Sequence, residues 1–590
     1  MIKGKVVLLT VLIGLSMFLA LCSNTEYGTA ALNKFRSYDE LKEFLQKPRP
    51  YYPPDYAFFL PDGNARVLSE SYGSYGYSKT NIQVEGVDEA DIVKTDGEFL
   101  YVISGQSVVI VKAYPPEEAA VLSRINVNGT LKQLFINGDR LVIFYEGTVQ
   151  TFYPEVIGKA YSGYCGEPKT FIQIYDVSFR EFPTLRREII VEGHYFNSRM
   201  IGNYVYAIVM RSACINNDEV ELPKICFDGE WREIDATEIY YSNVLDYAYI
   251  YTTIVAVNVQ SDWQEPTYGP LLLGATSTLY VSLSNIYLAI TDHHNTYLHR
   301  IHVEDDEITY VADGQVPGVV LNQFSMDEYN GYFRIATCYG GINSLYVLNM
   351  DLEIVGSLKD VAPREQIHSA RFMGDICYLV TFRKVDPFFV IDLADPYNPK
   401  VLGELKVSGY SDYLHLYDAN HVIGVGKETV PEEEGDFSWY QGVKISLFDV
   451  TNVSSPEEIA KYIIGERGTH SPVLSDHKAF LFNKEKQLLV IPVLVADINE
   501  SKYPQGVPPC VCGEPVWQGA YVFAVSLELE EKIVLRGTIT HIENGNVMDS
   551  THHITRALYI GDVLYTISES KVKMNSLLDL SEIKELNLKA

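Results

Sequence analysis

The sequence predicts an all-β protein, a β-propeller of about eight or nine four-stranded blades that follows a short helical N-terminal region. Three observations predict it. A turn pair rich in Asn, Asp and Gly is followed repeatedly by an apolar and aromatic strand. Strand-like segments recur four to a unit, at a period of roughly 40 to 50 residues outside the insertions. The 43 tyrosines suit half-buried sheet surfaces, because a tyrosine ring is apolar at one end and polar at the other.

A targeting segment is expected at the start of the chain. Lys3 and Lys5 precede an uncharged run from Val6 to Leu21. The run predicts a signal peptide over residues 1–23, and it also admits an uncleaved membrane anchor or a lipid attached at Cys22. All three alternatives place the protein outside the cell or on the outer face of the cell membrane. The membrane is then contacted only through this segment.

A short helix and a linker are expected over residues 24–83. Ser37 and Glu40 have the spacing of a capping box, and Leu41, Phe44 and Leu45 form one apolar face. The following KPRP stops the helix, and SESYGSYGYS is typical of a linker. The remaining residues, 84–590, are predicted to form the propeller as one domain with loop insertions on one face.

Turn pairs mark the start of each second strand. Asn, Asp and Gly supply the positive φ that tight hairpins need. One unit split between the two ends of the propeller would lower the count, so eight and nine blades both stay open. The pairs are Asp96-Gly97, Gly138-Asp139, Gly202-Asn203, Ser284-Asn285, Asn330-Gly331, Gly374-Asp375, Ala419-Asn420, Ser475-Asp476 and Gly561-Asp562.

Long phrases of the sequence resemble a known family. They include TNIQVEGVDEADIVKTDGEFLYVIS from residue 80, DHKAFLFNKEKQLLVIPV from residue 476 and TRALYIGDVLYTIS from residue 555. The family consists of exported prokaryotic, largely archaeal, proteins with a C-terminal β-propeller distantly related to WD-type repeats. The resemblance covers most of the chain and implies a secreted or membrane-tethered propeller. It implies no catalytic residues.

The charge and the motifs exclude several function classes. The formal net charge of −30 repels nucleic-acid phosphates, so a nucleic-acid binder is excluded. The sequence contains no P-loop, HExxH, GxSxG or dinucleotide-binding glycine motif, so no catalytic activity is assignable. The first predicted function is therefore a binding scaffold for an extracellular protein, glycan or small ligand.

The central channel offers a second hypothesis. The first strand of each blade lines the channel and begins at its upper mouth, so polar residues there are expected to converge. Imidazole and carboxylate suit a divalent metal such as zinc, copper or iron, and also acid/base catalysis. The alternative function is an exported metal- or acid/base-dependent enzyme; scattered histidines bonded to backbone or water are the plainer interpretation. The candidate residues are Glu85, Asp88, Asp91, His194, His368, Arg371, His415, His470, His552 and Arg556.

Long insertions are predicted between second and third strands, on the upper face, over residues 147–169, 212–251, 428–441 and 497–518. Elaborated loops on a rigid scaffold usually carry function, which favours this face. Five cysteines fall in the insertions, and export permits disulfides. Cys214 and Cys226 are predicted to pair, and Cys165 is predicted to join either Cys510 or Cys512.

Overall fold

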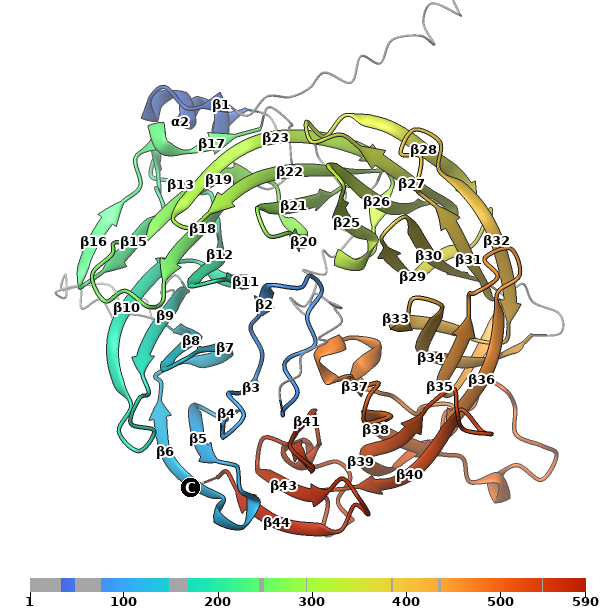
Figure 1. Ribbon diagram of the computed structural model, residues 1–590. Coiled ribbons are helices and arrows are strands. Elements are labelled where there is room, and N and C mark those ends of the chain that lie inside the picture. Colours follow the sequence, from blue (N-terminus) through green and yellow to red (C-terminus); the bar gives the residue numbers. More distant parts are fainter. Residues whose placement is uncertain are drawn as a thin grey trace, which may run out of the picture.

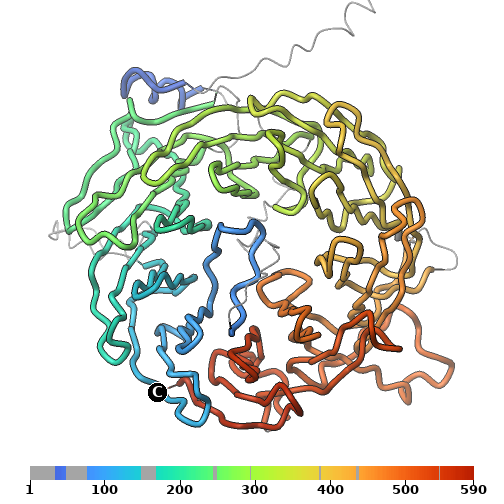
Figure 2. Tube along the Cα trace, in the orientation of Figure 1, coloured from blue at the N-terminus to red at the C-terminus, as the bar shows by residue number. Residues whose placement is uncertain are grey.

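A ring of β-sheets forms the body of the protein (Figures 1 and 2). The structure, a computed structural model, describes residues 33–47, 76–147, 168–242, 249–292, 294–383, 386–432, 437–543 and 545–589. Within these ranges nine sheets have four or more strands. They follow one another around the ring as blades 1 to 9, so the structure has nine blades, one of the two numbers that the sequence allows.

Blades 1 to 3 occupy the first part of the ring. Blade 1 consists of β3 (Val93–Thr95), β4 (Phe99–Ser104), β5 (Ser107–Lys112) and β6 (Ala120–Asn126). Blade 2 has β7 (Thr130–Asn137), β8 (Arg140–Gly147), β9 (Lys169–Asp176) and β10 (Thr184–Glu192), extended by β15 (Lys224–Phe227) and β16 (Glu230–Glu233). Blade 3 has β11 (His194–Ile201), β12 (Tyr204–Ser212), β18 (Ile250–Asn258) and β19 (Thr267–Leu273). Blade 3 also takes β2 (Val87–Glu89) at its inner edge, and β17 (Tyr240–Tyr241) and β1 (Asn33–Lys34) at its outer edge.

Blades 4 to 6 continue the ring. Blade 4 has β20 (Thr276–Val281), β21 (Asn285–Thr291), β22 (Asn295–Glu304) and β23 (Glu307–Pro317). Blade 5 has β25 (Met326–Tyr329), β26 (Tyr332–Tyr339), β27 (Ile342–Leu348) and β28 (Ile354–Val361), with β24 (Val319–Val320) also paired to β26. Blade 6 has β29 (Gln366–Met373), β30 (Ile376–Phe382), β31 (Asp386–Asp392) and β32 (Lys400–Val407).

Blades 7 to 9 complete the ring. Blade 7 has β33 (Tyr410–Asp418), β34 (His421–Pro431), β35 (Ser438–Asp449) and β36 (Glu457–Ile464). Blade 8 has β37 (Leu481–Asn483), β38 (Leu488–Asp497), β39 (Glu514–Val525) and β40 (Ile533–Ile539). Blade 9 has β41 (Arg556–Ile560), β42 (Val563–Ile567), β43 (Lys571–Ser576) and β44 (Glu582–Asn587).

Short elements decorate the loops. They are the hairpin of β13 (Ile215–Asn216) and β14 (Glu219–Val220), and the 3₁₀ turns η1 (Pro116–Glu118), η2 (Ala236–Glu238), η3 (Gln323–Ser325), η4 (Pro472–Leu474), η5 (His477–Ala479), η6 (Glu500–Lys502) and η7 (Ser550–His552). None of the described helices is long and apolar enough to span a bilayer. The predicted targeting segment, residues 1–23, lies outside the described residues.

The blades adhere through the two faces of each strand. Side chains alternate between the faces of a strand. In β5, Val109 and Val111 therefore pack against blade 9, while Val108 and Ile110 pack against blade 2. The same arrangement gives one buried cluster at each junction around the ring. The ring closes by packing blade 1 on blade 9, and Tyr77, which precedes blade 1, adds an antiparallel bridge to Ile560 of β41.

The predicted helix is confirmed as α2 (Tyr38–Gln46). Ser37 accepts a hydrogen bond from the Glu40 N–H at 3.2 Å, and the Glu40 carboxylate accepts one from the Arg36 N–H at 2.6 Å, one residue before the N-cap, so the second contact of the capping box is displaced by one residue. Leu41, Phe44 and Leu45 are buried, as predicted, in a cluster with the blade 3 insertion. The helix thus packs on the outside of the ring, where β1 pairs with β17 (Figure 1).

One predicted hairpin is wrong. Ser475 and Asp476 were expected to turn between two strands, but η4 and η5 occupy this part of blade 8. Asp476 caps η5 by accepting a hydrogen bond from the Lys478 N–H at 3.2 Å. The short β37 that follows is therefore the innermost strand of blade 8. The sequence misled because an Asp can accept hydrogen bonds from the backbone N–H groups of a 3₁₀ turn as well as from those of a hairpin.

Met574→Ala tests the closure of the ring by packing. The side chain is fully buried between blades 9 and 1, so the variant is expected to lose about 2–5 kcal/mol of unfolding free energy, measured by denaturant unfolding. The control is Leu578→Ala, a residue that is 88% exposed, which should change it by less than about 0.5 kcal/mol. Equal effects of the two substitutions would refute closure through this cluster.

Candidate functional site

Residues 76–92, which we call the channel segment, cross the middle of the ring before blade 1 begins (Figure 1, blue). Ser78 and Tyr559 of β41 are joined by backbone and hydroxyl hydrogen bonds. Asn81 then donates to the Tyr413 hydroxyl of blade 7 at 2.8 Å, and its carbonyl lies 3.0 Å from the His477 ring. The segment therefore ties distant blades together from inside the channel.

The second half of the segment contacts the other side of the ring. Gln83 donates to the Gln323 carbonyl beside blade 5 at 3.0 Å. β2 then pairs antiparallel with β11 of blade 3, and Asp91 forms a bridge with Leu134 of β7 in blade 2. Hydrogen bonds from one segment thus reach seven of the nine blades, counting blade 1 into which it runs.

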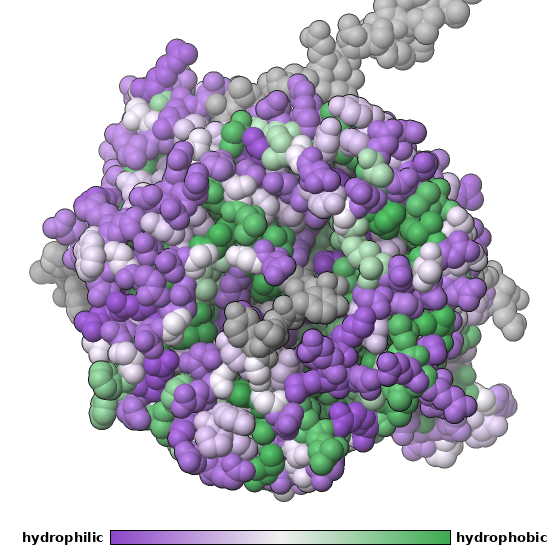
Figure 3. Space-filling view, in the orientation of Figure 1, coloured by the Kyte–Doolittle hydropathy of each residue, from purple (hydrophilic) through white to green (hydrophobic). Residues whose placement is uncertain are grey.

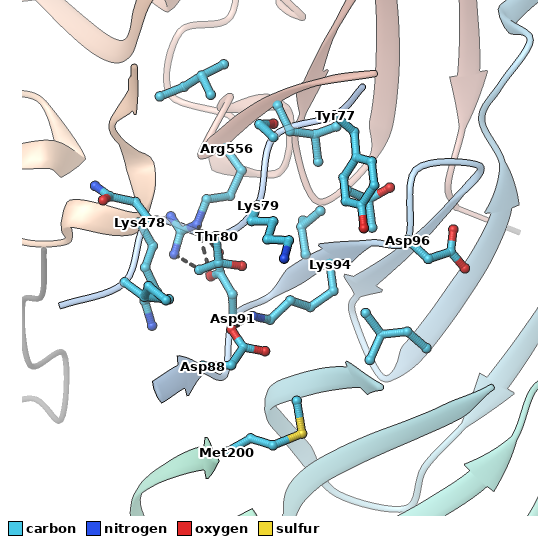
Figure 4. Close-up of a pocket in the computed structure, with 18 of the residues that line it drawn as sticks. Tyr77, Lys79, Thr80, Asp88, Asp91, Lys94, Asp96, Met200, Lys478 and Arg556 are labelled. Carbon is cyan, nitrogen blue, oxygen red and sulfur yellow. Dashed lines mark hydrogen bonds and ion pairs between the residues drawn. The ribbon is translucent and has the colours of Figure 1, made fainter. Parts of the chain in front are cut away.

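Asp91 and Arg556 form a buried ion pair in the channel. Arg556 Nε and Nη2 lie 3.0 and 2.9 Å from Asp91 Oδ1 (Figure 4). Nη2 also binds Asp476 of blade 8 at 2.5 Å. All three side chains are largely buried. Burial by itself would raise the pKa of Asp476, but the charges of Arg556 and Lys478 outweigh it and lower that pKa.

Two further carboxylates of the segment, Asp88 and Glu89, are paired as well. Asp88 lies 2.7 Å from the buried Lys94 ammonium. Glu89 is buried 3.8 Å from Arg199 and accepts a hydrogen bond from the Gln83 N–H at 3.0 Å. Burial raises the pKa of Glu89, against the opposing effect of Arg199. Asp88, Glu89 and Asp91 therefore hold the segment in the channel through their basic partners.

A cavity of about 650 Å³, the channel cavity, lies beside the segment toward the face where the innermost strands end. Figure 4 shows Lys79 and Lys94 between the Arg556–Asp91 pair and Asp96. Asp96 accepts a hydrogen bond from the Tyr101 hydroxyl at 2.9 Å and pairs with Arg180 at 3.2 Å. Glu85 lines the cavity and is exposed, so of the three predicted acids it is the one open to solvent.

The predicted histidines do not gather at one point. Each lies beside a different local group: His194 Nδ1 is 3.6 Å from Glu146, His368 Nδ1 is 3.7 Å from Asp412, and His552 Nδ1 is 3.1 Å from Asp549. His470 is exposed and bridges Leu494 through its backbone. No group of three or more His, Cys, Asp or Glu placed to hold a metal ion occurs in the described ranges.

His415 and Arg371 are buried in the channel wall. The His415 ring lies 3.3 Å from the Tyr413 hydroxyl and packs on Phe480 and Phe482. Burial, with a smaller effect of the Arg371 charge, lowers the pKa of His415 to about 3. The imidazole is therefore neutral at physiological pH and belongs to the core.

The structure does not join Cys214 and Cys226, so their predicted disulfide stays a prediction. Both are free thiols, and they belong to different packing environments. Cys226 lies in β15, which pairs with β10 of blade 2, and its side chain packs in the core between blades 1 and 2. Cys214 follows β12 and is exposed. Cys510 and Cys512 are exposed free thiols, and Cys165 lies outside the described residues, so its pairing stays a prediction.

A second hollow lies on the upper face, where the innermost strands begin, between blades 6 and 7. This upper-face pocket has a volume of about 450 Å³. Its lining combines basic and aromatic side chains: Arg364, His368, Arg383 and Arg467 with Phe382, Phe437, Trp439 and Tyr440. Apart from His368, the site predicted from sequence contains none of these. Phe437, Trp439 and Tyr440 lie at the start of β35, in a stretch expected only as part of the insertion over residues 428–441.

The comparisons agree with the fold and the sequence resemblance. This is a β-propeller, and the chain belongs to the family described as Beta propeller domain, whose model matches residues 77–580. It is 26% identical to an uncharacterised protein of Archaeoglobus fulgidus over 95% of both chains. It is 28% identical to an uncharacterised protein of Methanocaldococcus jannaschii, covering 84% of this chain and 81% of that one. The predicted resemblance to an archaeal propeller family is confirmed.

Solved structures match more weakly. AztD of Citrobacter koseri is 10% identical and covers 85% of this chain and 95% of its own, with a TM-score of 0.35. The periplasmic gluconolactonase PpgL of Pseudomonas aeruginosa is 10% identical and covers 57% of this chain and 91% of its own, with a TM-score of 0.33. Scores at this level carry no argument about what this chain binds.

Asp91→Asn tests the ion pair that holds the channel segment. The variant leaves Arg556 buried with only Asp476, so the unfolding free energy is expected to fall by about 3 kcal/mol. Asp562→Asn, at a side chain that is 94% exposed, is the control and should cost less than about 1 kcal/mol. Similar losses in the two variants would show that the pair does not fasten the segment.

His415→Phe tests the neutral buried imidazole. The pKa of His415 is depressed in the folded state, so the unfolded chain binds more protons and stability falls as the pH drops from about 6.5 toward 3. The slope due to this residue is up to about 1.4 kcal/mol per pH unit. The variant should lose that part of the slope in unfolding measured between pH 7 and pH 4. His552→Phe, at a half-exposed position, is the control, and an unchanged slope in His415→Phe would contradict the assignment.

Proposed function

We propose that the protein is an exported β-propeller that binds an extracellular protein, glycan or small ligand through its upper face. One observation carries this proposal. Asp88, Glu89 and Asp91 of the channel segment are paired with basic side chains, whereas the upper-face pocket presents basic and aromatic side chains around a hollow. Convergent polar groups in a largely aromatic concavity are typical of binding sites.

The channel is the less suitable place for catalysis in this proposal. A general acid or base must reach its substrate and exchange a proton with it. Asp91 and Glu89 are instead buried against Arg556 and Arg199, where they stabilise the segment. The enzyme alternative would require these pairs to open.

The position of the loop insertions supports the upper face as the binding surface. They connect second to third strands, as between β12 and β18 or between β38 and β39, and so extend from one face of the ring. Figure 3 shows one face of the molecule, mostly hydrophilic with apolar side chains in separate patches. The export part of the proposal depends on residues 1–23, whose Lys3 and Lys5 precede the uncharged run.

Locating the full chain in an archaeal host and screening the purified protein tests the proposal. The protein is expected in the surface or secreted fraction. Thermal unfolding with extracellular proteins, glycans and small ligands should show a stabilising class, since a ligand at about 100 times its Kd adds about 2.7 kcal/mol. The ligand should be recovered unchanged.

Elemental analysis of the same preparation distinguishes the binding scaffold from the metal-dependent enzyme. We expect no stoichiometric zinc, copper or iron. A bound metal that is lost on His470→Ala or His552→Ala, or turnover of a screened ligand, would overturn the scaffold function. A cytoplasmic location of the full chain would overturn the export part of the proposal.

A further inference from the structure

We propose that the upper-face pocket binds a ring-bearing carboxylate, either an acidic sugar or an aromatic acid. The inference rests on the proposed binding function and names the ligand class for it. The pocket lies where the upper ends of β29 and β30 meet the start of β35 and the loop after β36. Its volume of about 450 Å³ suits one or two rings.

Arg467 is held in place at the rim of the pocket. Its guanidinium carbon lies 4.8 Å from the centre of the Trp439 ring, over the ring face. Nη1 donates to the Pro509 carbonyl at 3.1 Å, and Nε donates to Cys512 Sγ at 3.3 Å. Within the described part of the chain Nη2 makes no hydrogen bond that competes with a ligand. A guanidinium fixed in this way offers planar N–H donors that match a carboxylate.

The aromatic wall supplies a surface for a ring. Phe437 and Tyr440 are each 44% exposed, although large aromatic side chains are usually more deeply buried. Tyr440 is kept in place by the Tyr410 ring at 5.4 Å and by Phe382 at 6.2 Å. Burying a ligand ring against these faces releases apolar surface from water and fixes the ring beside the guanidinium.

The charge of the pocket opposes that of the whole protein. The chain has a net charge of −30, yet the residues that line this pocket in the described part of the chain include three arginines and a histidine and no acidic residue. Two described acids nearby have partners of their own: Asp412 lies 3.7 Å from His368 Nδ1, and Glu432 accepts a hydrogen bond from the Trp439 indole N–H. A basic pocket in an acidic surface selects an anion against the overall field, because short-range charge contacts outweigh screened distant charges.

Isothermal titration of the full chain at low salt tests the inference. The probes are digalacturonate for the acidic sugar and 4-hydroxybenzoate for the aromatic acid, with cellobiose and phenol as neutral counterparts. At least one carboxylate should bind about tenfold or more tightly than its neutral counterpart, the effect of one charge-assisted hydrogen bond. Binding of digalacturonate alone identifies a sugar site, and binding of 4-hydroxybenzoate alone identifies an aromatic-acid site.

Two variants place the binding in this pocket. Arg467→Gln and Arg364→Gln remove guanidiniums from the lining, and each should weaken carboxylate binding about tenfold or more while leaving neutral probes unaffected. Arg364 is exposed, so its variant keeps the fold even if the Arg467 contacts matter for the loop. The matched control is Arg232→Gln, which removes a guanidinium stacked 4.1 Å over Phe227 on blade 2 and should bind as the parent does.

The outcomes separate this inference from the proposed function. Carboxylates that bind no tighter than neutral probes, or that bind both pocket variants as tightly as the parent, would overturn the inference. The proposed scaffold function would then stand if another ligand class stabilises the protein in the screen. A chain that no screened class stabilises would overturn the proposed function as well.

Discussion

The ion pair between Asp91 and Arg556 is the contact on which the arrangement of the channel depends. It joins a residue that precedes the first blade to the first residue of the last blade, and through Asp476 it reaches the blade before that. Buried charges of this kind are costly unless every partner is present. The pair thus fixes one position of the channel segment relative to both ends of the ring, where apolar packing alone would tolerate several.

The architecture was readable from the sequence because it repeats. Alternating strands and turn residues are local signals that recur from blade to blade. A wrong prediction in one blade therefore does not change the predicted fold. The exception is instructive: Asp476 sits in the same sequence context as the hairpin turns, but it caps η5 and binds Arg556. A contact with a residue 80 positions away leaves no trace in the local pattern.

The functional residues were harder to predict because a single sequence shows residue type and not direction. Asp88 and Asp91 do lie in the channel, as expected, but Lys94 and Arg556 neutralise them. His194, His368 and His552 lie near strand starts, yet each turns to a different neighbour. Trp439 near the start of β35 and Arg467 in the loop after β36 are 28 residues apart, so only the folded chain shows that they stack.

The position of residues 76–92 has a consequence for how the molecule is made. This stretch is synthesised before any blade, but in the finished protein every blade surrounds it. A closed ring offers little room for an irregular strand to thread in afterwards, so assembly in chain order, with the ring built around its own leading strand, is the simplest route. Chain order is then part of the design: the same blades in a circularly permuted chain, with residues 76–92 last, would face a threading problem that the natural order avoids.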